Sequence, residues 1–383
     1  MNVLFHVGLK GRAAKFSRLA AAMVIVSATL LSSAVSRADN QKHVLFINPG
    51  FVERGFWKSV SDTMSAAANS LGFRLTIVSA DRKWPLMVSR GLDAIKTTAP
   101  DYVIIVNENQ QAPRLMEAAE ARSIPMLLLL NSLTEDQEKT FGTPRSIFKN
   151  WIGSITPDNA VAGYEMAKSL EAAAQKSGKT TGPVTLLTLA GDFKTPASIE
   201  RLAGLDQALK ESKRLKEVRR LTVNWSEQDA YQRTAIMSRQ TVVDTVWAAN
   251  DPIAFGAIRA LREQKLEPGC DFFVAGLNWS TEAVEMVRRG EMTLTHGGHF
   301  LAGAYAMVML YNYDRGRDFA EIGTHIRFPM SAIDQENAEL YARYFGDEDW
   351  SKIDFGALTR SQEPNRRNYL FTLTSLLAAI RVR

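Results

Sequence analysis

Residues 43–57 read HVLFINPGFVERGFW, and this stretch decides the class of fold. Within it, Val44–Ile47 is an unbroken apolar run with no polar alternation. Such a run predicts a strand buried on both faces, as found in parallel sheets that are covered by helices. The polar turn that follows leads into Trp57–Leu71, where apolar positions recur with helical period. The stretch therefore predicts one strand–loop–helix unit of an α/β fold.

The same unit repeats along the chain. The further expected strands are short apolar runs at 74–78, 102–106, 126–130, 184–189, 221–224, 242–248, 272–275 and 292–295. The helices expected among them include 113–122, 158–174, 199–212, 252–264 and 281–289. The rhythm breaks once, at the polar segment 131–151, which has no strand of its own. We therefore expect two α/β halves with parallel sheets, and a ligand site in the crevice at the carboxyl ends of the strands.

The first 38 residues have the three-part pattern of a secretory signal. They hold five of the 46 basic residues and none of the 41 acidic ones, and they include the thirteen-residue apolar run Leu19–Leu31. Ser36 and Ala38 place small residues before a cut at Asp39. Because a membrane span takes about twenty residues, this run predicts a cleaved signal peptide rather than an anchor. We expect a mature protein in the periplasm.

Composition excludes several classes of protein. Outside the leader the basic and acidic residues balance, so the charge gives no argument for nucleic-acid binding. A hydrophobic content of 46% and a charged content of 23% exclude bulk disorder. The single cysteine, Cys270, excludes an intramolecular disulfide and a multi-cysteine metal site. Its place just before an apolar run favours a small, buried core residue.

Amides, hydroxyls and aromatic rings recur at the carboxyl ends of the expected strands. Amides and hydroxyls hydrogen-bond the polar edges of a small molecule, and rings cover its apolar faces. Each residue alone also fits a turn, a helix cap or a core position, and Arg201 beside Glu200 also fits a surface ion pair. The candidate ligand-binding residues are Asn48, Phe56, Trp57, Asn131, Ser132, Ser198, Arg201, Asn250, Asn278 and His296.

The sequence gives little support to catalysis. It contains no G-x-S-x-G, H-E-x-x-H or G-x-x-x-x-G-K motif, and no G-x-G-x-x-G follows a strand. His296 and His299 have no carboxylate or third histidine near them in the sequence, so we expect no metal and no cofactor. A secreted enzyme is the disfavoured alternative.

Five motifs in order resemble those of the periplasmic sugar-binding proteins of the ribose-binding and LacI-like type, the type I periplasmic binding proteins. The resemblance covers residue 43 to about residue 354. The motifs are Asn48-Pro49 with Phe56-Trp57, SITPDN at 154–159 with Ala162-Gly163, Ser198 with ERLAG at 200–204, ANDP at 249–252 with Ala254 and Gly256-Ala257, and VAGLN at 274–278.

This resemblance implies two Rossmann-like lobes with parallel sheets, joined by three crossings near Ser154, Gly298 and Arg327. The N-terminal lobe is then 39–154 plus 298–327, the C-terminal lobe is 155–297 plus 328–354, and 355–383 is an extension. It also implies roles for five residues. Phe56 and Trp57 sandwich the ligand, Asn48 flanks it, and Arg201 and Asn250 hydrogen-bond its oxygens.

The function implied is that of a monomeric solute-binding protein, which delivers a small polar ligand, a sugar or sugar derivative, to the permease of an ABC importer. A sensor subunit, presenting the ligand to a membrane sensor kinase or chemoreceptor, is the alternative. A DNA-binding repressor of the same lineage is excluded because a leader stands where its helix-turn-helix would lie.

Two departures from the ribose-binding pattern bear on the ligand. Asn131-Ser132 stands in place of an Asp-Arg pair, and Asn278 stands in place of an Asp. Loss of these carboxylates weakens the case for a plain pentose or hexose and leaves Arg201 less neutralised, which permits an acidic ligand. In the extension, the apolar stretch 369–380 predicts a terminal helix packed on one lobe, with a membrane-docking element as the alternative.

Overall fold

The computed structural model describes residues 41–178, 182–360 and 368–380. The expected signal peptide, 1–38, lies outside the described residues. Everything below concerns the compact unit formed by residues 43–383.

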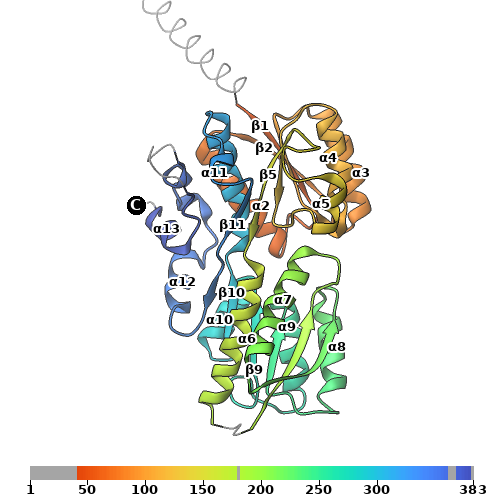
Figure 1. Ribbon diagram of the computed structural model, residues 1–383. Coiled ribbons are helices and arrows are strands. Elements are labelled where there is room, and N and C mark those ends of the chain that lie inside the picture. The colour runs from red at the N-terminus through yellow and green to blue at the C-terminus, as the bar shows by residue number, and fades with distance from the viewer. Residues whose placement is uncertain (1–40, 179–181, 361–367, 381–383) are drawn as a thin grey trace, which may run out of the picture. The chain divides into compact units, whose positions relative to one another are not determined.

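The first sheet has six parallel strands in the order β11-β5-β4-β3-β1-β2 (Figure 1). One face is covered by α2 and α11, which pack against each other, and the other by α3 and α4 (Figure 1). The strands are β1 His43–Asn48, β2 Arg74–Ser79, β3 Tyr102–Ile105, β4 Met126–Leu129, β5 Trp151–Pro157 and β11 His325–Phe328. The helices that follow β1 to β4 and the helix α11 are α2 Phe56–Leu71, α3 Trp84–Thr97, α4 Ala112–Glu120, α5 Glu135–Phe141 and α11 Ala302–Asp314.

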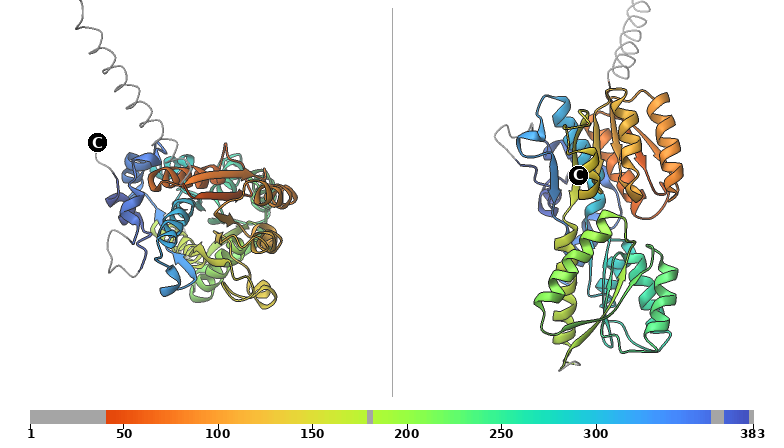
Figure 2. Two further views of the ribbon diagram at one scale, coloured as in Figure 1. Left: turned by 90° about the horizontal axis from the view of Figure 1, so that it is seen from above. Right: turned by 45° about the vertical axis from the view of Figure 1, so that its right-hand side comes forward.

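The second sheet has the order β12-β10-β9-β8-β6-β7, and only β12 runs antiparallel to its neighbour. Helices α6 and α7 pack together on one face, and α8 packs on α9 on the other (Figures 1 and 2). The strands are β6 Val184–Ala190, β7 Leu215–Thr222, β8 Thr245–Ala248, β9 Phe273–Leu277, β10 Leu294–Gly297 and β12 Ser331–Ile333. The helices are α6 Asn159–Lys176, α7 Pro196–Glu211, α8 Glu227–Met237, α9 Asp251–Arg262 and α10 Thr281–Arg288.

The expected fold class, two α/β lobes with parallel sheets, is confirmed. The strands β5, β11 and β12 have no counterpart among the expected runs, and β7 begins at Leu215 rather than at Leu221. It is an edge strand with half-exposed charged residues, so it lacks the apolar run of a central strand. Helix α11 is buried on nearly every side and therefore shows no amphipathic period. The lobe boundaries at 154, 298 and 327 remain a prediction.

Close contact between α6 and α7 fixes the helix that carries Arg201. A Cβ atom on Gly204 would overlap the carbonyl oxygen of Ala160, and one on Gly163 would overlap the carbonyl oxygen of Arg201. Two glycines therefore let the helix backbones approach, and this approach places the start of α7 at the carboxyl end of the second sheet.

The C-terminal segment lies alongside both lobes (Figure 2). Helix α12, Ala338–Phe345, packs on α10, and the short helices at 350–352 and 355–358 pack on α2. In the described part of the extension, Phe371 is buried and stacks on Tyr305 of α11 at a centroid distance of 4.1 Å. It is followed by the six-residue helix α13, Leu373–Ala378, in which Leu376 is buried.

One expectation was wrong. Cys270 is exposed, because it lies in the turn before β9 rather than in the strand itself.

Over the described ranges, every helix is too short or too polar to cross a membrane.

Candidate functional site

A cavity of about 490 Å³ lies at the carboxyl ends of both sheets. Each of the strands β1 to β10 is followed, or ended, by at least one residue that lines it. From the first sheet these are Phe51, Arg54, Gly55, Phe56, Trp57, Arg82, Glu108, Leu130, Asn131 and Pro157. From the second sheet they are Thr195, Ala197, Arg201, Asn224, Trp225, Ser226, Asn250, Pro252 and Asn278, and His299 follows β10.

Phe56 provides an aromatic wall of the cavity from the first residue of α2. Its ring stacks on that of His299, with centroids 4.4 Å apart and planes at 21°. Burial and the nearby Arg201 hold the pKa of His299 well below its ordinary value, so this histidine is neutral. Trp57 meets Phe56 edge-on at 5.2 Å but is only 7% exposed and packs mainly in the core. Phe56 therefore presents the more accessible ring.

Asn131 joins the two lobes directly. It follows β4 of the first sheet, and its side-chain oxygen accepts a hydrogen bond of 3.2 Å from the backbone N–H of Ala197, at the start of α7. Asn250, on the opposite side, caps α9 by accepting from the N–H of Ile253. Asn250 caps the helix with its side-chain oxygen only. Its side-chain NH2 group can therefore still serve the cavity that Asn250 lines.

Arg201 is the most deeply buried charge in the wall, with 3% of its surface exposed. Its Nε donates to the side-chain oxygen of Asn159 at 3.0 Å, and its Nη1 donates to the carbonyl of Ala249 at 2.7 Å. Its Nη2 lies 3.4 Å from Nε2 of His299. Burial lowers the pKa of Arg201 to about 10, so the side chain remains a cation at neutral pH.

Trp225 covers the cavity from the loop after β7. Its Nε1 donates to Asp192 at 2.6 Å, and its ring lies 5.8 Å from the guanidinium carbon of Arg201. Asp192 also accepts from Thr195 and from the N–H of Lys194. Burial alone would raise the pKa of Asp192, but these hydrogen bonds hold it below the ordinary value. The Trp225 ring is thus held in place by an ionised carboxylate.

An ion pair between Arg82 and Glu108 lines the first-lobe side of the cavity. Arg82 follows β2 and Glu108 follows β3, and their nearest side-chain atoms are 3.5 Å apart. Burial raises the pKa of Glu108, whereas the charge of Arg82 opposes this shift.

Six of the ten candidate residues line this cavity, namely Phe56, Trp57, Asn131, Arg201, Asn250 and Asn278. Asn48 lies behind it, fully buried, where its side chain donates to Ser61 and accepts from the N–H of Gly50. In that position Asn48 shapes the loop that carries Phe56.

The other three candidates also lie outside the lining. His296 lies within β10 and faces α6, where its Nε2 is 2.8 Å from Glu165. Ser132 accepts from Asn107 through its carbonyl. Ser198 is 1% exposed within α7.

Several lining residues escaped the sequence reasoning. Arg82 and Glu108 follow the second and third strands, and neither is among the candidates, although Trp84 follows the second strand and Asn107 follows the third. Trp225 and His299 were visible at strand ends, but a lone ring at a turn also fits a core residue. Phe51 and Arg54 belong to the loop 49–55, whose path no sequence pattern specifies.

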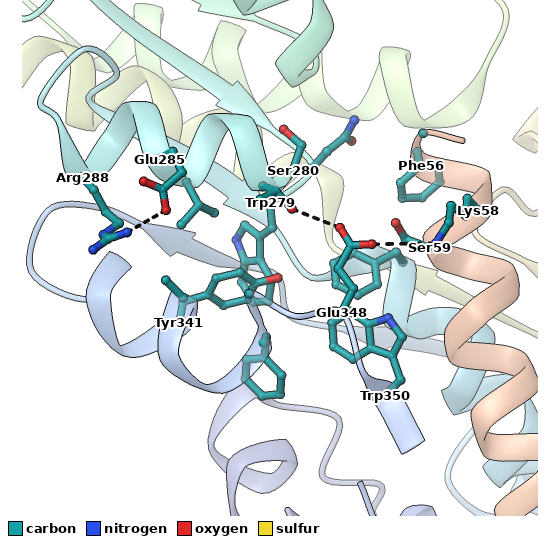
Figure 3. A pocket seen from close by; sticks show the side chains of 18 of the residues that line it. Phe56, Lys58, Ser59, Trp279, Ser280, Glu285, Arg288, Tyr341, Glu348 and Trp350 are labelled. Carbon is teal, nitrogen blue, oxygen red and sulfur yellow. Dashed lines mark hydrogen bonds and ion pairs between the residues drawn. The ribbon is translucent and has the colours of Figure 1, made fainter. Parts of the chain in front are cut away.

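A second cavity of about 690 Å³ lies beside the first (Figure 3). Phe56 and Asn278 line both, so these side chains lie between the two spaces. Its wall combines polar and charged side chains with aromatic rings, among them Trp279, Tyr341 and Trp350, which are labelled in Figure 3.

Charged side chains of the second cavity pair within its own wall. Glu348 accepts from Thr281 at 3.0 Å and lies 3.8 Å from Lys58, and Arg288 pairs with Glu285 at 2.7 Å (Figure 3). In the first cavity, by contrast, Arg201 has only neutral hydrogen-bond partners.

Metal ligands do not cluster in either cavity. Within the part of the chain that the structure describes, no three histidine, cysteine, aspartate or glutamate side chains come together as a metal site would require.

Comparison with known proteins identifies the family. Residues 44–318 match the model of the periplasmic binding protein domain. The crystal structure of a periplasmic sugar-binding protein from Pseudomonas fluorescens is 30% identical, with a TM-score of 0.78 over 88% of this chain and 99% of that one.

Curated relatives agree. The ribose import binding protein of Haemophilus influenzae is 23% identical, covering 71% of this chain and 85% of the relative. The D-apiose import binding protein of Paraburkholderia graminis is 25% identical, covering 71% and 81%. With its two parallel-sheet lobes and a cavity at their carboxyl ends, this chain belongs to the periplasmic binding protein family.

Proposed function

We propose that the protein is a periplasmic solute-binding protein, which captures one small polyhydroxylated ligand between its lobes and delivers it to the permease of an ABC importer. One observation carries the proposal. The carboxyl ends of ten strands from two sheets converge on a single cavity, whose volume of about 490 Å³ suits a small ligand. The import roles printed in the names of the ribose and D-apiose relatives support the same function.

The chemistry of the wall favours a sugar or sugar derivative. Asn131 and Asn278 offer amides from opposite lobes, and Phe56 and Trp225 offer rings. Amide groups hydrogen-bond hydroxyls in either direction, while a ring covers the apolar face of a sugar. Arg201 adds the strongest donor.

A thermal-shift screen of the mature protein tests this function. The panel holds pentoses, hexoses, furanose sugars, polyols and sugar acids, with amino acids as negative controls. We expect one carbohydrate class to raise the unfolding temperature, since a ligand at a hundredfold excess over Kd stabilises the native state by about 2.7 kcal/mol. If every carbohydrate at millimolar concentration leaves the unfolding temperature unchanged, the proposed function is wrong.

We also propose that residues 1–38 direct export and are then removed. The acid-free basic start and the short apolar run motivate this, and the periplasmic relatives support it. Intact-mass spectrometry of protein from the periplasmic fraction should give a chain that begins at Asp39. A mass that retains the leader contradicts the proposal.

The sensor alternative differs in its membrane partner rather than in its cavity. Neighbouring genes for a permease and an ATPase support the importer, and a lone sensor-kinase gene supports the sensor.

A further inference from the structure

The cavity proposed to hold the ligand carries an unbalanced positive charge. The arginine and glutamate side chains that line it are Arg54, Arg82, Arg201 and Glu108. Arg82 and Glu108 form a pair, so each offsets the other. Arg54 is exposed at the rim, where its guanidinium carbon lies 4.4 Å from the centre of the Phe51 ring. Arg201 remains as the buried cation of the wall.

Arg201 keeps unused donors. A guanidinium has five N–H groups, and the structure gives three of them partners: Asn159, the carbonyl of Ala249, and His299. All three partners are neutral, since His299 carries no charge. Among the described residues, no carboxylate oxygen lies within 4.0 Å of this guanidinium in an ion pair. Two N–H groups of Arg201 therefore remain for a ligand.

The nearest carboxylates serve other donors. Both oxygens of Asp251 accept hydrogen bonds, from the N–H and hydroxyl of Ser280 and from the hydroxyl of Thr295. Glu200 binds Arg327 and the amide of Asn159. The negative charges of Glu200 and Asp251 raise the pKa of Arg201 through space. This effect is smaller than the lowering of the pKa by burial. A buried charge without a hydrogen-bonded counterion is costly, and a ligand that supplies one removes that cost.

We propose that the ligand is a sugar acid, a hexuronate or an aldonate, whose carboxylate binds the two remaining N–H groups of Arg201. The inference rests on the function proposed above and specifies its ligand class. The planar fork of arginine matches a carboxylate and makes charge-assisted hydrogen bonds, which are about twice as strong as neutral ones. The amides and rings of the wall remain for the hydroxylated part of the ligand.

A carboxylate fits the burial better than a phosphate does. Arg201 is the single buried cation without an ionic partner among the described lining residues, and it balances one negative charge. A phosphate monoester carries between one and a half and two charges at neutral pH. Its second charge would be desolvated with only the exposed Arg54 available to balance it.

Calorimetric titration of the mature protein tests the inference. The probes are D-galacturonate, D-glucuronate and D-gluconate, each beside its neutral amide, together with the parent sugars and glucose 6-phosphate. We expect at least one acid to bind about tenfold or more tightly than its own amide. The amide is the sharpest control, because it keeps the shape and loses only the charge.

Three variants assign the effect to its residue. Arg201→Gln should bring the acid-to-amide affinity ratio close to one, and Arg54→Gln should reduce it only two- to threefold, because exposed charges are screened. Arg259→Gln is the control, since Arg259 lies exposed on α9 and pairs with Glu227. If Arg201→Gln does not fold, the acid-to-amide affinity ratios of the wild type and of Arg54→Gln still show whether the site prefers a carboxylate and whether the exposed Arg54 accounts for that preference.

The outcomes separate the two claims. If neutral sugars bind as tightly as the acids, or more tightly, the sugar-acid inference is overturned while the solute-binding function stands. Tighter binding of glucose 6-phosphate overturns the assignment of a carboxylate. An acid-to-amide ratio that Arg201→Gln leaves unchanged removes Arg201 from the site. If none of these carbohydrates binds but another member of the thermal-shift panel does, the inference fails and the proposed function stands; if no carbohydrate of either panel binds, both fail.

Discussion

Gly204→Ala should lower the free energy of unfolding by about 3 kcal/mol and the unfolding temperature by about 4 °C. The new methyl group would overlap the carbonyl oxygen of Ala160 and the backbone nitrogen of Tyr164, so α6 and α7 must separate. Both contacts are backbone atoms, which cannot rotate away as a side chain can. The measurement is thermal unfolding followed by circular dichroism.

The matched control is Gly182→Ala. Gly182 precedes β6, its φ is not in the left-handed region, and a Cβ there meets nothing within 4 Å. This variant should unfold within about 1 °C of wild type. Because α7 carries Ala197 and Arg201 into the cavity wall, Gly204→Ala should also weaken ligand binding. Wild-type stability in Gly204→Ala would contradict the close contact of α6 with α7.

Trp225→Ala should weaken binding of the ligand about 30-fold, or about 2 kcal/mol, with little change in the unfolding temperature. The ring lines the cavity and is only partly buried, and it packs at the margin of the core, so its removal takes away a ligand contact and only a small part of the core packing. Asp192 retains the hydrogen bonds from Thr195 and Lys194, which keeps the loop in place. Calorimetric titration with the strongest binder of the screen measures the change.

Two further variants sharpen this result. Trp225→Phe keeps a ring and loses only the hydrogen bond to Asp192, so it should retain most of the affinity. Trp84→Ala removes a tryptophan that is 41% exposed at the start of α3 and does not line the cavity, so it should bind as wild type does. Equal losses in Trp225→Ala and Trp84→Ala would show that the effect does not come from the cavity.

The central strands could be predicted from the sequence because burial on both faces leaves a direct mark. Runs such as YVII and MLLL lie in the middle of the first sheet and contain no polar residue. The edge strand β7 carries no such mark because its residues are charged and half exposed, and β12 carries none because it has only three residues. Helix α11 was missed for the opposite reason, since its burial on nearly all sides removes the amphipathic period.

The site was predictable only in part. A place at a strand end indicates where a residue lies but not the direction in which its side chain points. His296 ends a strand as the argument required, yet it faces α6 and Glu165. Asn48 also follows a strand, but its side chain turns back to hydrogen-bond Ser61 and Gly50. The pairing of Arg82 with Glu108 depends on two loops that are far apart in sequence, and no local pattern specifies it.

The location of the bound ligand tests the central claim most directly. The measurement is a crystal structure of the protein grown with the strongest binder of the screen. Electron density for one molecule should lie in the 490 Å³ cavity, between Trp225 and Phe56 and within hydrogen-bond distance of Arg201. Density in the second cavity, against Tyr341 and Trp350, would contradict the account, as would an empty first cavity at saturating ligand.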